Sequence, residues 1–172
     1  MFLAPVRRVV TGHSPTGHAV IESDQFLIPQ DAINASFSAV TGTMGFVNLW
    51  VTESSAPVDP QAPWTDTHGT NIPLSDNVGT TVRIVDFPHG PGIRHRTRSV
   101  DFAVVLEGEL ELELDNGVKT IMKKNDVAVQ RGTIHAWRNV GEGTARMMFV
   151  LIPSEPVKVG DKELEETGFP PR

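Results

Sequence analysis

The fold is decided by a run of uninterrupted alternation, which reads Glu109-Leu110-Glu111-Leu112-Glu113-Leu114-Asp115-Asn116-Gly117. Successive side chains of an extended strand point to opposite faces, so the leucines form one face and the carboxylates the other. The last three residues tolerate a positive φ, as the tip of a β-hairpin requires. The run therefore predicts a half-buried strand that ends in a hairpin turn.

Similar short strands, separated by turn residues, recur about every ten residues on both sides of this run. Downstream, the pattern predicts strands over residues 118–122, 127–130, 135–139 and 146–152. Upstream, it predicts strands over residues 7–10, 18–23, 46–52 and 80–87. This spacing is typical of an antiparallel sandwich or barrel, so the expected fold class is all-β.

The chain is long enough for one well-packed domain, at 172 residues. We expect a single domain over residues 1–172 with its main barrel at about 80–152. Strands within 1–52 are expected to add to a sheet edge, and residues 53–79 form a loop insertion rich in Pro, Ser, Thr and Asp. The tail at 153–172 holds one plausible helical turn, Lys162-Glu163-Leu164-Glu165-Glu166.

The composition excludes several classes of protein. Lys and Arg number 15 against 21 Asp and Glu, so no broad positive field favours nucleic acid or an anionic membrane surface. The absence of cysteine excludes disulfides, thiolate metal ligands and a cysteine nucleophile. Phosphate-cradling loops and dinucleotide fingerprints are also missing, so no nucleotide or organic cofactor is expected. Without a secretory signal pattern or an apolar run of membrane-spanning length, the expected location is cytoplasmic.

Two of the six histidines stand next to strands in the strongly alternating half of the chain. His95 opens the segment 95–101, and His135 begins the strand expected at 135–139. If these strands pair across a barrel, both imidazoles and the carboxylate of Asp101 converge inside it. Two imidazoles and one carboxylate are the donor set of a facial metal triad, which leaves positions open for water, substrate or dioxygen.

The spacing of these residues resembles the cupin superfamily, whose small β-barrels carry two motifs around an interior site. The second motif ends in a glycine, a histidine and an asparagine at the spacing of Gly132, His135 and Asn139. Two positions of that motif depart from it, since Asn125 stands at the usual first glycine and Arg131 at the usual proline.

The first motif of the family has two histidines followed by a glutamate. In this chain His95 stands at the first histidine position, Thr97 at the second and Asp101 at the acidic position. The resemblance extends from about Pro88 to Ile152. It implies a cupin-type double-stranded β-helix, or jelly-roll, barrel with extra N-terminal strands.

Family members with the full ligand set hold a divalent metal such as iron, manganese, nickel or zinc. The resemblance therefore implies His95, Asp101 and His135 as metal ligands here, with Thr97 a poor neutral donor. Aspartate is one methylene shorter than glutamate, which shortens its reach toward a metal held by two imidazoles. The alternative is a degenerate site whose polar residues hydrogen-bond one another.

Strand parity predicts what surrounds this site. Ala103 and Val105 share a face with Asp101, and Trp137 shares one with His135. A mostly apolar cavity with a few polar groups suits a small organic ligand, although core packing alone also explains a lone tryptophan. The expected substrate-binding residues are Thr97, Ala103, Val105 and Trp137, and the expected catalytic residues are Asp101 and His135.

Three arginines alternate with the smaller donors of the first motif, at Arg94, Arg96 and Arg98. They form either a ring of guanidiniums that attracts a carboxylate substrate or a solvated face. In the second case, their partners are the carboxylates that face outward at Glu109, Glu111 and Glu113.

Two functions are consistent with these observations. The first is a metal-dependent enzyme of the lyase or decarboxylase, isomerase or dioxygenase type, acting on a small carboxylated or aromatic metabolite. Without a metal, Asp101 or His135 would act as general base. The second is a non-catalytic cupin that binds or senses a metabolite with a degenerate metal site. The strand 146–152 is apolar on both faces and requires cover on both, so a homodimer is expected.

Overall fold

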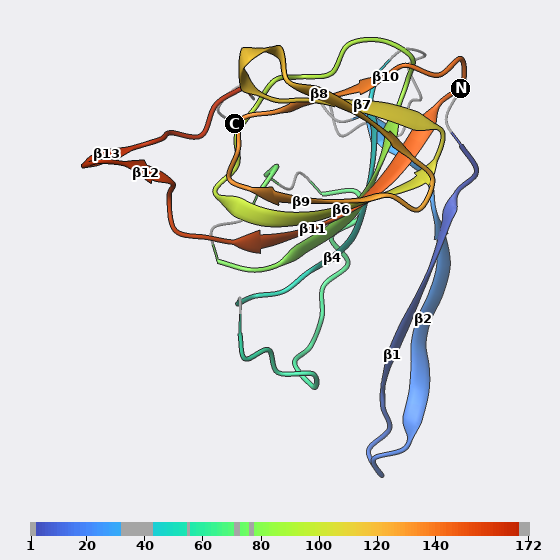
Figure 1. The fold of residues 1–172 in the computed structure, drawn as a ribbon. Coiled ribbons are helices and arrows are strands. Elements are labelled where there is room, and N and C mark those ends of the chain that lie inside the picture. The colour runs from blue at the N-terminus through green and yellow to red at the C-terminus, as the bar shows by residue number, and fades with distance from the viewer. Residues whose placement is uncertain (1–2, 32–42, 55, 71–72, 76–77, 169–172) are drawn as a thin grey trace.

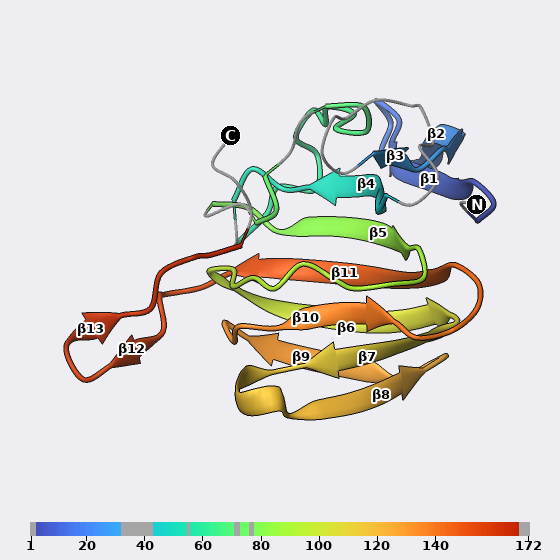
Figure 2. The ribbon, with the colours of Figure 1, turned by 90° about the horizontal axis from the view of Figure 1, so that it is seen from above.

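The computed structural model describes residues 3–31, 43–54, 56–70, 73–75 and 78–168. Its strands form two facing sheets and two separate hairpins (Figures 1 and 2). This is the all-β, double-stranded β-helix architecture that the sequence predicts. Among the described residues, no helix is both long and apolar enough to cross a membrane.

The larger sheet has six strands in the order β3-β4-β5-β11-β6-β9. Their bounds are β3 Gln30–Asp31, β4 Gly45–Val51, β5 Thr81–Phe87, β6 Ser99–Glu107, β9 Val127–Arg131 and β11 Ala145–Pro153. The smaller sheet has the order β10-β7-β8, with β7 at Glu109–Glu113, β8 at Lys119–Lys123 and β10 at Ala136–Asn139. In Figure 1 this sheet faces β6, β9 and β11, and the barrel interior lies between the two layers.

The alternating run forms β7 and confirms the predicted half-buried strand. Leu110 is fully buried and Leu112 nearly so, because both side chains point into the barrel. The carboxylates on the other face meet lysines of β8, with Lys119 Nζ placed 2.9 Å from Glu111 Oε1. A short 3₁₀ turn at Asp115–Gly117 joins the two strands, and Asn116 adopts a φ of 58° there.

The N-terminal strands extend the fold in two ways. Strand β4, which the sequence predicts, and the short β3, which it does not, extend one end of the larger sheet, whereas β1 (Val6–His13) and β2 (Ala19–Leu27) do not join that sheet. Strands β1 and β2 are longer than predicted and form a hairpin that projects away from the barrel (Figure 1).

The predicted helical turn in the C-terminal tail is wrong. The tail instead forms the small hairpin of β12 (Lys158–Val159) and β13 (Lys162–Glu163). Gly160 adopts a φ of +61° in the turn between these strands. This conformation favours glycine, so the chain reverses there and pairs with itself.

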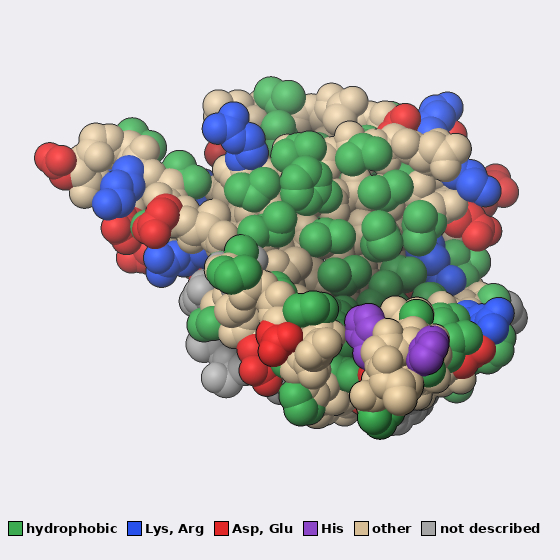
Figure 3. Space-filling model, turned by 90° about the horizontal axis from the view of Figure 1, so that it is seen from below, with side chains coloured by type: hydrophobic (Ala, Val, Ile, Leu, Met, Phe, Trp, Pro, Cys, Tyr) green, Lys and Arg blue, Asp and Glu red, His purple; other side chains and the backbone are tan. Residues whose placement is uncertain are grey.

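The outer face of the larger sheet carries an extensive apolar surface (Figure 3). The base of the β1–β2 hairpin covers one part of this face, where Leu27 packs with Val47 and Ile84. The part formed by β6 and β9 is open, and its most exposed apolar side chains are Phe102, Val127 and Val129. An exposed apolar surface of this kind marks an interaction site, so the homodimer expected from the sequence has a surface on which to form.

The homodimer stays a prediction, and Phe102 gives the means to test it. We expect the wild-type protein to have a dimer mass in light scattering at micromolar concentration, and Phe102→Lys to lower that mass because a buried lysine charge opposes association. The matched control is Val20→Lys on the projecting hairpin, which should leave the mass unchanged. A monomeric wild-type protein would contradict the prediction.

Candidate active site

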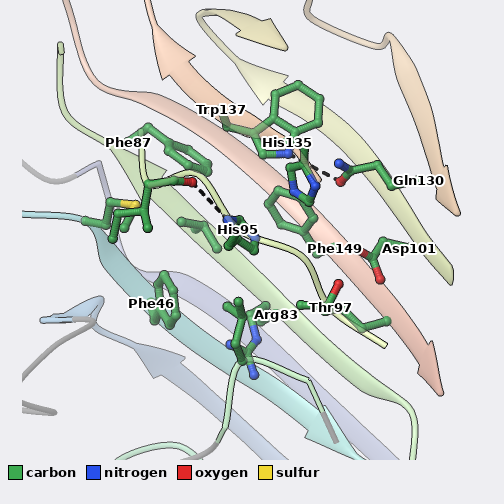
Figure 4. Close-up of a pocket in the computed structure, with 15 residues that line it drawn as sticks. Phe46, Arg83, Phe87, His95, Thr97, Asp101, Gln130, His135, Trp137 and Phe149 are labelled. Atoms are coloured by element: carbon green, nitrogen blue, oxygen red, sulfur yellow. Dashed lines mark hydrogen bonds between the residues drawn. The ribbon is translucent and has the colours of Figure 1, made fainter. Parts of the chain in front are cut away.

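A cavity lies between the two sheets, lined by side chains of both. Its empty space is about 520 Å³, part of which is open to solvent. Most of its wall is apolar, with a few polar side chains among aliphatic and aromatic ones (Figure 4). The lining residues are Met44, Phe46, Leu74, Arg83, Val85, Phe87, Ile93, His95, Thr97, Asp101, Gln130, His135, Trp137, Phe149 and Leu151.

The two motif histidines meet in the wall of this cavity. The backbones of His95 and His135 exchange two hydrogen bonds of 2.9 Å, which form an isolated antiparallel bridge. Their ring centroids are 4.4 Å apart. Gly132, with a φ of +62°, turns the chain out of β9 just before His135. The local backbone therefore places both rings side by side, as the sequence predicts.

Hydrogen bonds to the backbone fix the tautomer of both imidazoles. Nδ1 of His95 donates to the carbonyl of Ile93, and Nδ1 of His135 donates to the carbonyl of Thr133, each at 2.9 Å. A carbonyl oxygen only accepts, so the hydrogen of each neutral ring lies on Nδ1 and the lone pair on Nε2. Burial lowers the pKa of both rings, in His135 to about 4 with a contribution from His95. Both imidazoles are therefore neutral at neutral pH.

Asp101 projects from β6 into the same cavity and is 3% exposed. Burial raises the pKa of its carboxyl group to about 6, because the apolar surroundings disfavour the charged form. The hydroxyls of Ser99 and Thr97 and the charge of Arg83 oppose this shift but do not cancel it. Asp101 Oδ1 is buried and has no hydrogen-bond partner among the described residues.

Gln130 is a cavity residue that the sequence reasoning missed. It pairs with Asp101 in the register of β9 and β6, and both side chains are buried. The indole Nε1 of Trp137 donates to Gln130 Oε1 at 3.3 Å. The signal available in the sequence was a single polar residue at the end of an otherwise apolar predicted strand at 127–130.

Arg83 is the second cavity residue that was missed. Its side chain is almost fully buried, donates to the carbonyl of Pro73 at 2.8 Å and lies with its guanidinium 5.3 Å from the centroid of the Phe46 ring. It shares strand parity with Val85 and Phe87, which also line the cavity. A charged residue on the inward face of a predicted strand was the signal for it.

The loop insertion reaches the cavity through Pro73 and Leu74. Earlier in this insertion, both carboxylate oxygens of Asp66 accept hydrogen bonds from the buried Arg8 of β1, at 2.9 and 2.8 Å. Trp64 packs beside this pair, with its ring centroid 5.3 Å from the Arg8 guanidinium and 5.4 Å from the centroid of Trp50. The projecting hairpin therefore anchors the insertion whose Leu74 forms part of the cavity wall.

Two of the four residues expected to bind substrate line the cavity, namely Thr97 and Trp137. Ala103 and Val105 do face inward on the same side of β6 as Asp101. They are fully buried in the hydrophobic core and are not among the cavity-lining residues. Strand parity predicts the face of a side chain but not its depth along the barrel, which explains the difference.

The three arginines of the first motif segment lie outside the cavity wall. Arg94 is 2.6 Å from Asp115 and 3.6 Å from Glu113, which fits the solvated face proposed as one alternative. Arg96 donates through Nε to the carbonyl of Gly132. The structure therefore does not support a guanidinium ring around the mouth.

The predicted metal triad is only partly assembled. The part of the chain that the structure describes contains no group of three or more His, Asp or Glu side chains that could hold a metal ion. His95 and His135 are adjacent, and Asp101 lines the cavity without completing a cluster with them. A facial triad needs all three donors on one ion, so the residues as arranged do not fit that site.

Metal content remains a question for experiment. From this geometry we expect substoichiometric iron, manganese, nickel or zinc in protein purified without added metal, and the same content in His135→Ala. Elemental analysis of both proteins is the measurement. One equivalent of metal in the wild type, lost in His135→Ala, would contradict this expectation and restore His95, Asp101 and His135 as ligands.

Comparisons with known proteins identify the family. The cupin-domain family profile matches residues 83–151. Phomopsin biosynthesis cluster protein C' of Diaporthe leptostromiformis is 37% identical over 168 residues, covering 91% of this chain and 83% of that protein. The cupin-domain-containing oxidoreductase fogC of Aspergillus ruber is 32% identical over 171 residues, covering 95% and 80%. Oryzines biosynthesis cluster protein J of Aspergillus oryzae is 50% identical over 91 residues, covering 52% and 51%. The chain therefore belongs to the cupin family.

Proposed function

We propose that this cupin is an enzyme that removes a proton from a small, largely apolar or aromatic metabolite, with the Asp101 carboxylate as general base. Proton removal of this kind is the first step of isomerase and lyase reactions. Relatives named as biosynthesis cluster proteins and as a cupin-domain-containing oxidoreductase support an enzymatic role on a small organic molecule.

The observation that carries this proposal is the environment of Asp101. A general base works best when its pKa lies near the working pH, and burial brings the pKa of Asp101 to about 6. The carboxylate is poorly solvated when ionised, since Asp101 is 3% exposed in a mostly apolar cavity. Its Oδ1 has no partner among the described residues, so this oxygen is available to a bound substrate.

The imidazole pair has a different part in this proposal. With a pKa of about 4, His135 is a weak base at neutral pH. Its Nε2 lone pair accepts a hydrogen bond from a hydroxyl or N–H group of the substrate, and the adjacent His95 ring packs beside it. The pair therefore orients a polar edge of the substrate, while Asp101 takes the proton.

The apolar walls indicate the shape of the substrate. Trp137 and Phe149 lie edge to face with centroids 6.3 Å apart, and Phe87 lies 6.4 Å from Phe149. These rings pack against a flat, apolar body, which gains free energy from leaving water. An aromatic or otherwise planar metabolite fits this wall better than a strongly charged one.

The second candidate function is a non-catalytic cupin that binds a metabolite in the same cavity. The incomplete triad favours it, because a cupin without an assembled metal site has lost one route to turnover. The metal-dependent reactions expected from the sequence, of the lyase, decarboxylase, isomerase or dioxygenase type, require a bound metal, which the elemental analysis tests. Turnover of a probe without added metal separates the first candidate from the binding module.

A nitrobenzisoxazole is a suitable probe because its ring opens when a base removes one carbon-bound hydrogen. The C–H electron pair forms the nitrile, the N–O bond breaks, and the coloured phenolate is released. We expect the wild-type protein to accelerate this reaction and Asp101→Asn to lower the rate on the order of a hundredfold, as loss of a general base does. The control is Asp24→Asn, which removes an exposed carboxylate on the hairpin and should leave the rate unchanged.

The pH dependence of this reaction tests the same residue. The base must be ionised, so the rate should rise with pH through about 6 and stay level above it. A rate that falls as pH rises through this range, or equal rates in wild type and Asp101→Asn, would rule out Asp101 as the base. Saturable probe binding without phenolate release would support the binding module instead.

A further inference from the structure

The orientation of the Gln130 side-chain amide is fixed by chemistry. The indole N–H of Trp137 can only donate, so the Gln130 atom 3.3 Å from it must be the oxygen. The amide nitrogen of Gln130 therefore takes no part in the hydrogen bond with Trp137. Trp137 is itself 3% exposed and packed in the core, so it holds this orientation rigidly.

The amide nitrogen of Gln130 is a buried donor that lacks a hydrogen-bond partner among the described residues. Gln130 is 4% exposed and lines the cavity. A buried donor without a partner has lost its hydrogen bonds to water and gained none in the protein, which is unfavourable. A ligand that brings an acceptor to this nitrogen recovers that free energy, so Nε2 defines a position for an oxygen atom of the ligand.

Gln130 and Asp101 present their groups together. They are direct partners in the register of the neighbouring strands β9 and β6, and both side chains enter the cavity. Figure 4 shows them next to each other on the same side of the cavity. The paired residues therefore bring one buried neutral donor, Gln130 Nε2, and one buried acceptor, Asp101 Oδ1, to the same part of the cavity wall, and neither atom has a hydrogen-bond partner from the described part of the chain.

A carbonyl group and its α-hydrogen match this arrangement, because they stand on adjacent carbon atoms. We propose that the substrate is a neutral, enolisable ketone, that Gln130 Nε2 binds its carbonyl oxygen, and that its α-hydrogen faces Asp101. This inference rests on the proposed function of Asp101 as base. It makes Gln130 a catalytic residue, since it touches the oxygen on which charge develops.

The proposed step balances without an oxidant. Asp101 Oδ1 takes the α-proton, the C–H electron pair becomes the C=C bond, and the C=O π pair moves to the oxygen. The resulting enolate oxygen accepts from Gln130 Nε2, and a hydrogen bond to this charge is stronger than one to the ketone. Return of a proton to the α-carbon completes an exchange or an isomerisation. A carboxylated substrate fits less well, because its charge would face the ionised Asp101.

The probes are β-tetralone, a flat bicyclic ketone, and tetralin, which has the same rings without the carbonyl. Exchange of α-hydrogens of β-tetralone in deuterated water, followed by proton NMR, should be faster with the wild-type protein than in buffer. Gln130→Met should lower this exchange on the order of a hundredfold, the usual cost of losing one donor to a developing oxyanion. Turnover of the nitrobenzisoxazole should fall much less than ketone exchange, because the base is intact and the nitrophenolate oxygen is a stable anion that depends less on one donor.

Two further measurements keep the test decisive. Gln130→Glu retains an oxygen that accepts from Trp137 but removes the N–H donor, and its ratio of ketone exchange to nitrobenzisoxazole turnover should fall as in Gln130→Met. The affinity of the wild-type protein should favour β-tetralone over tetralin about fivefold to tenfold, and Gln130→Met should remove this preference. Gln25→Met on the hairpin is the matched control. It should change neither the ratio of ketone exchange to nitrobenzisoxazole turnover nor the preference for β-tetralone over tetralin.

The outcomes separate this inference from the proposed function. If the nitrobenzisoxazole is turned over and both Gln130 variants keep the wild-type ratio, the ketone assignment is overturned and the base assignment stands. If the wild-type protein turns over neither probe, the base assignment falls. In that case a ketone preference that disappears in Gln130→Met would still support recognition of a carbonyl oxygen, and equal affinity for both bicyclic probes would overturn it.

Discussion

Desolvation inside an apolar barrel governs the protonation of Asp101, His95 and His135 in the cavity. The two sheets bury leucine, valine and aromatic side chains on their inner faces, and only a few polar residues share that space. Burial raises the pKa of Asp101 and lowers the pKa of His95 and His135, so charge is disfavoured on all three. The carboxyl group becomes a stronger base and the imidazoles become neutral hydrogen-bond acceptors. Burial is the largest cause of all three pKa shifts.

Backbone geometry converts this environment into a defined site. The antiparallel bridge between His95 and His135 places both rings side by side, and backbone carbonyls hold the hydrogen of each ring on Nδ1. The register of β6 and β9 sets Asp101 beside Gln130. These constraints come from backbone hydrogen bonds between strands and in turns, so the functional groups are held in place without a ligand. The apolar face of a planar ligand then has the aromatic wall to pack on, and its polar edge meets fixed partners.

The sequence predicts the local features of this protein well and the non-local ones poorly. Alternation in residues 109–114 and the parity of Asp101 with its neighbours depend only on the two-residue period of a strand, and the structure shows both. The meeting of His95 and His135 was predicted from motif spacing and is observed. The sequence does not predict Gln130 and Arg83 as cavity residues. Gln130 lies beside Asp101 only through the register of two strands, and Arg83 is held by a contact with a distant loop. The expected helical turn at 162–166 failed for a similar reason, since pairing with residues before Gly160 decides the local structure there.

Membership of the cupin family explains the barrel, whereas the donor set of this chain explains its proposed chemistry. Thr97 stands at the position of one usual imidazole, and the acidic position holds a shorter side chain that lies beside Gln130. The most direct test of the account is a carbon NMR titration of the Asp101 carboxyl carbon in the folded protein. The account predicts a midpoint of about 6. A midpoint at the ordinary value of an aspartate, near 3.8, would contradict it.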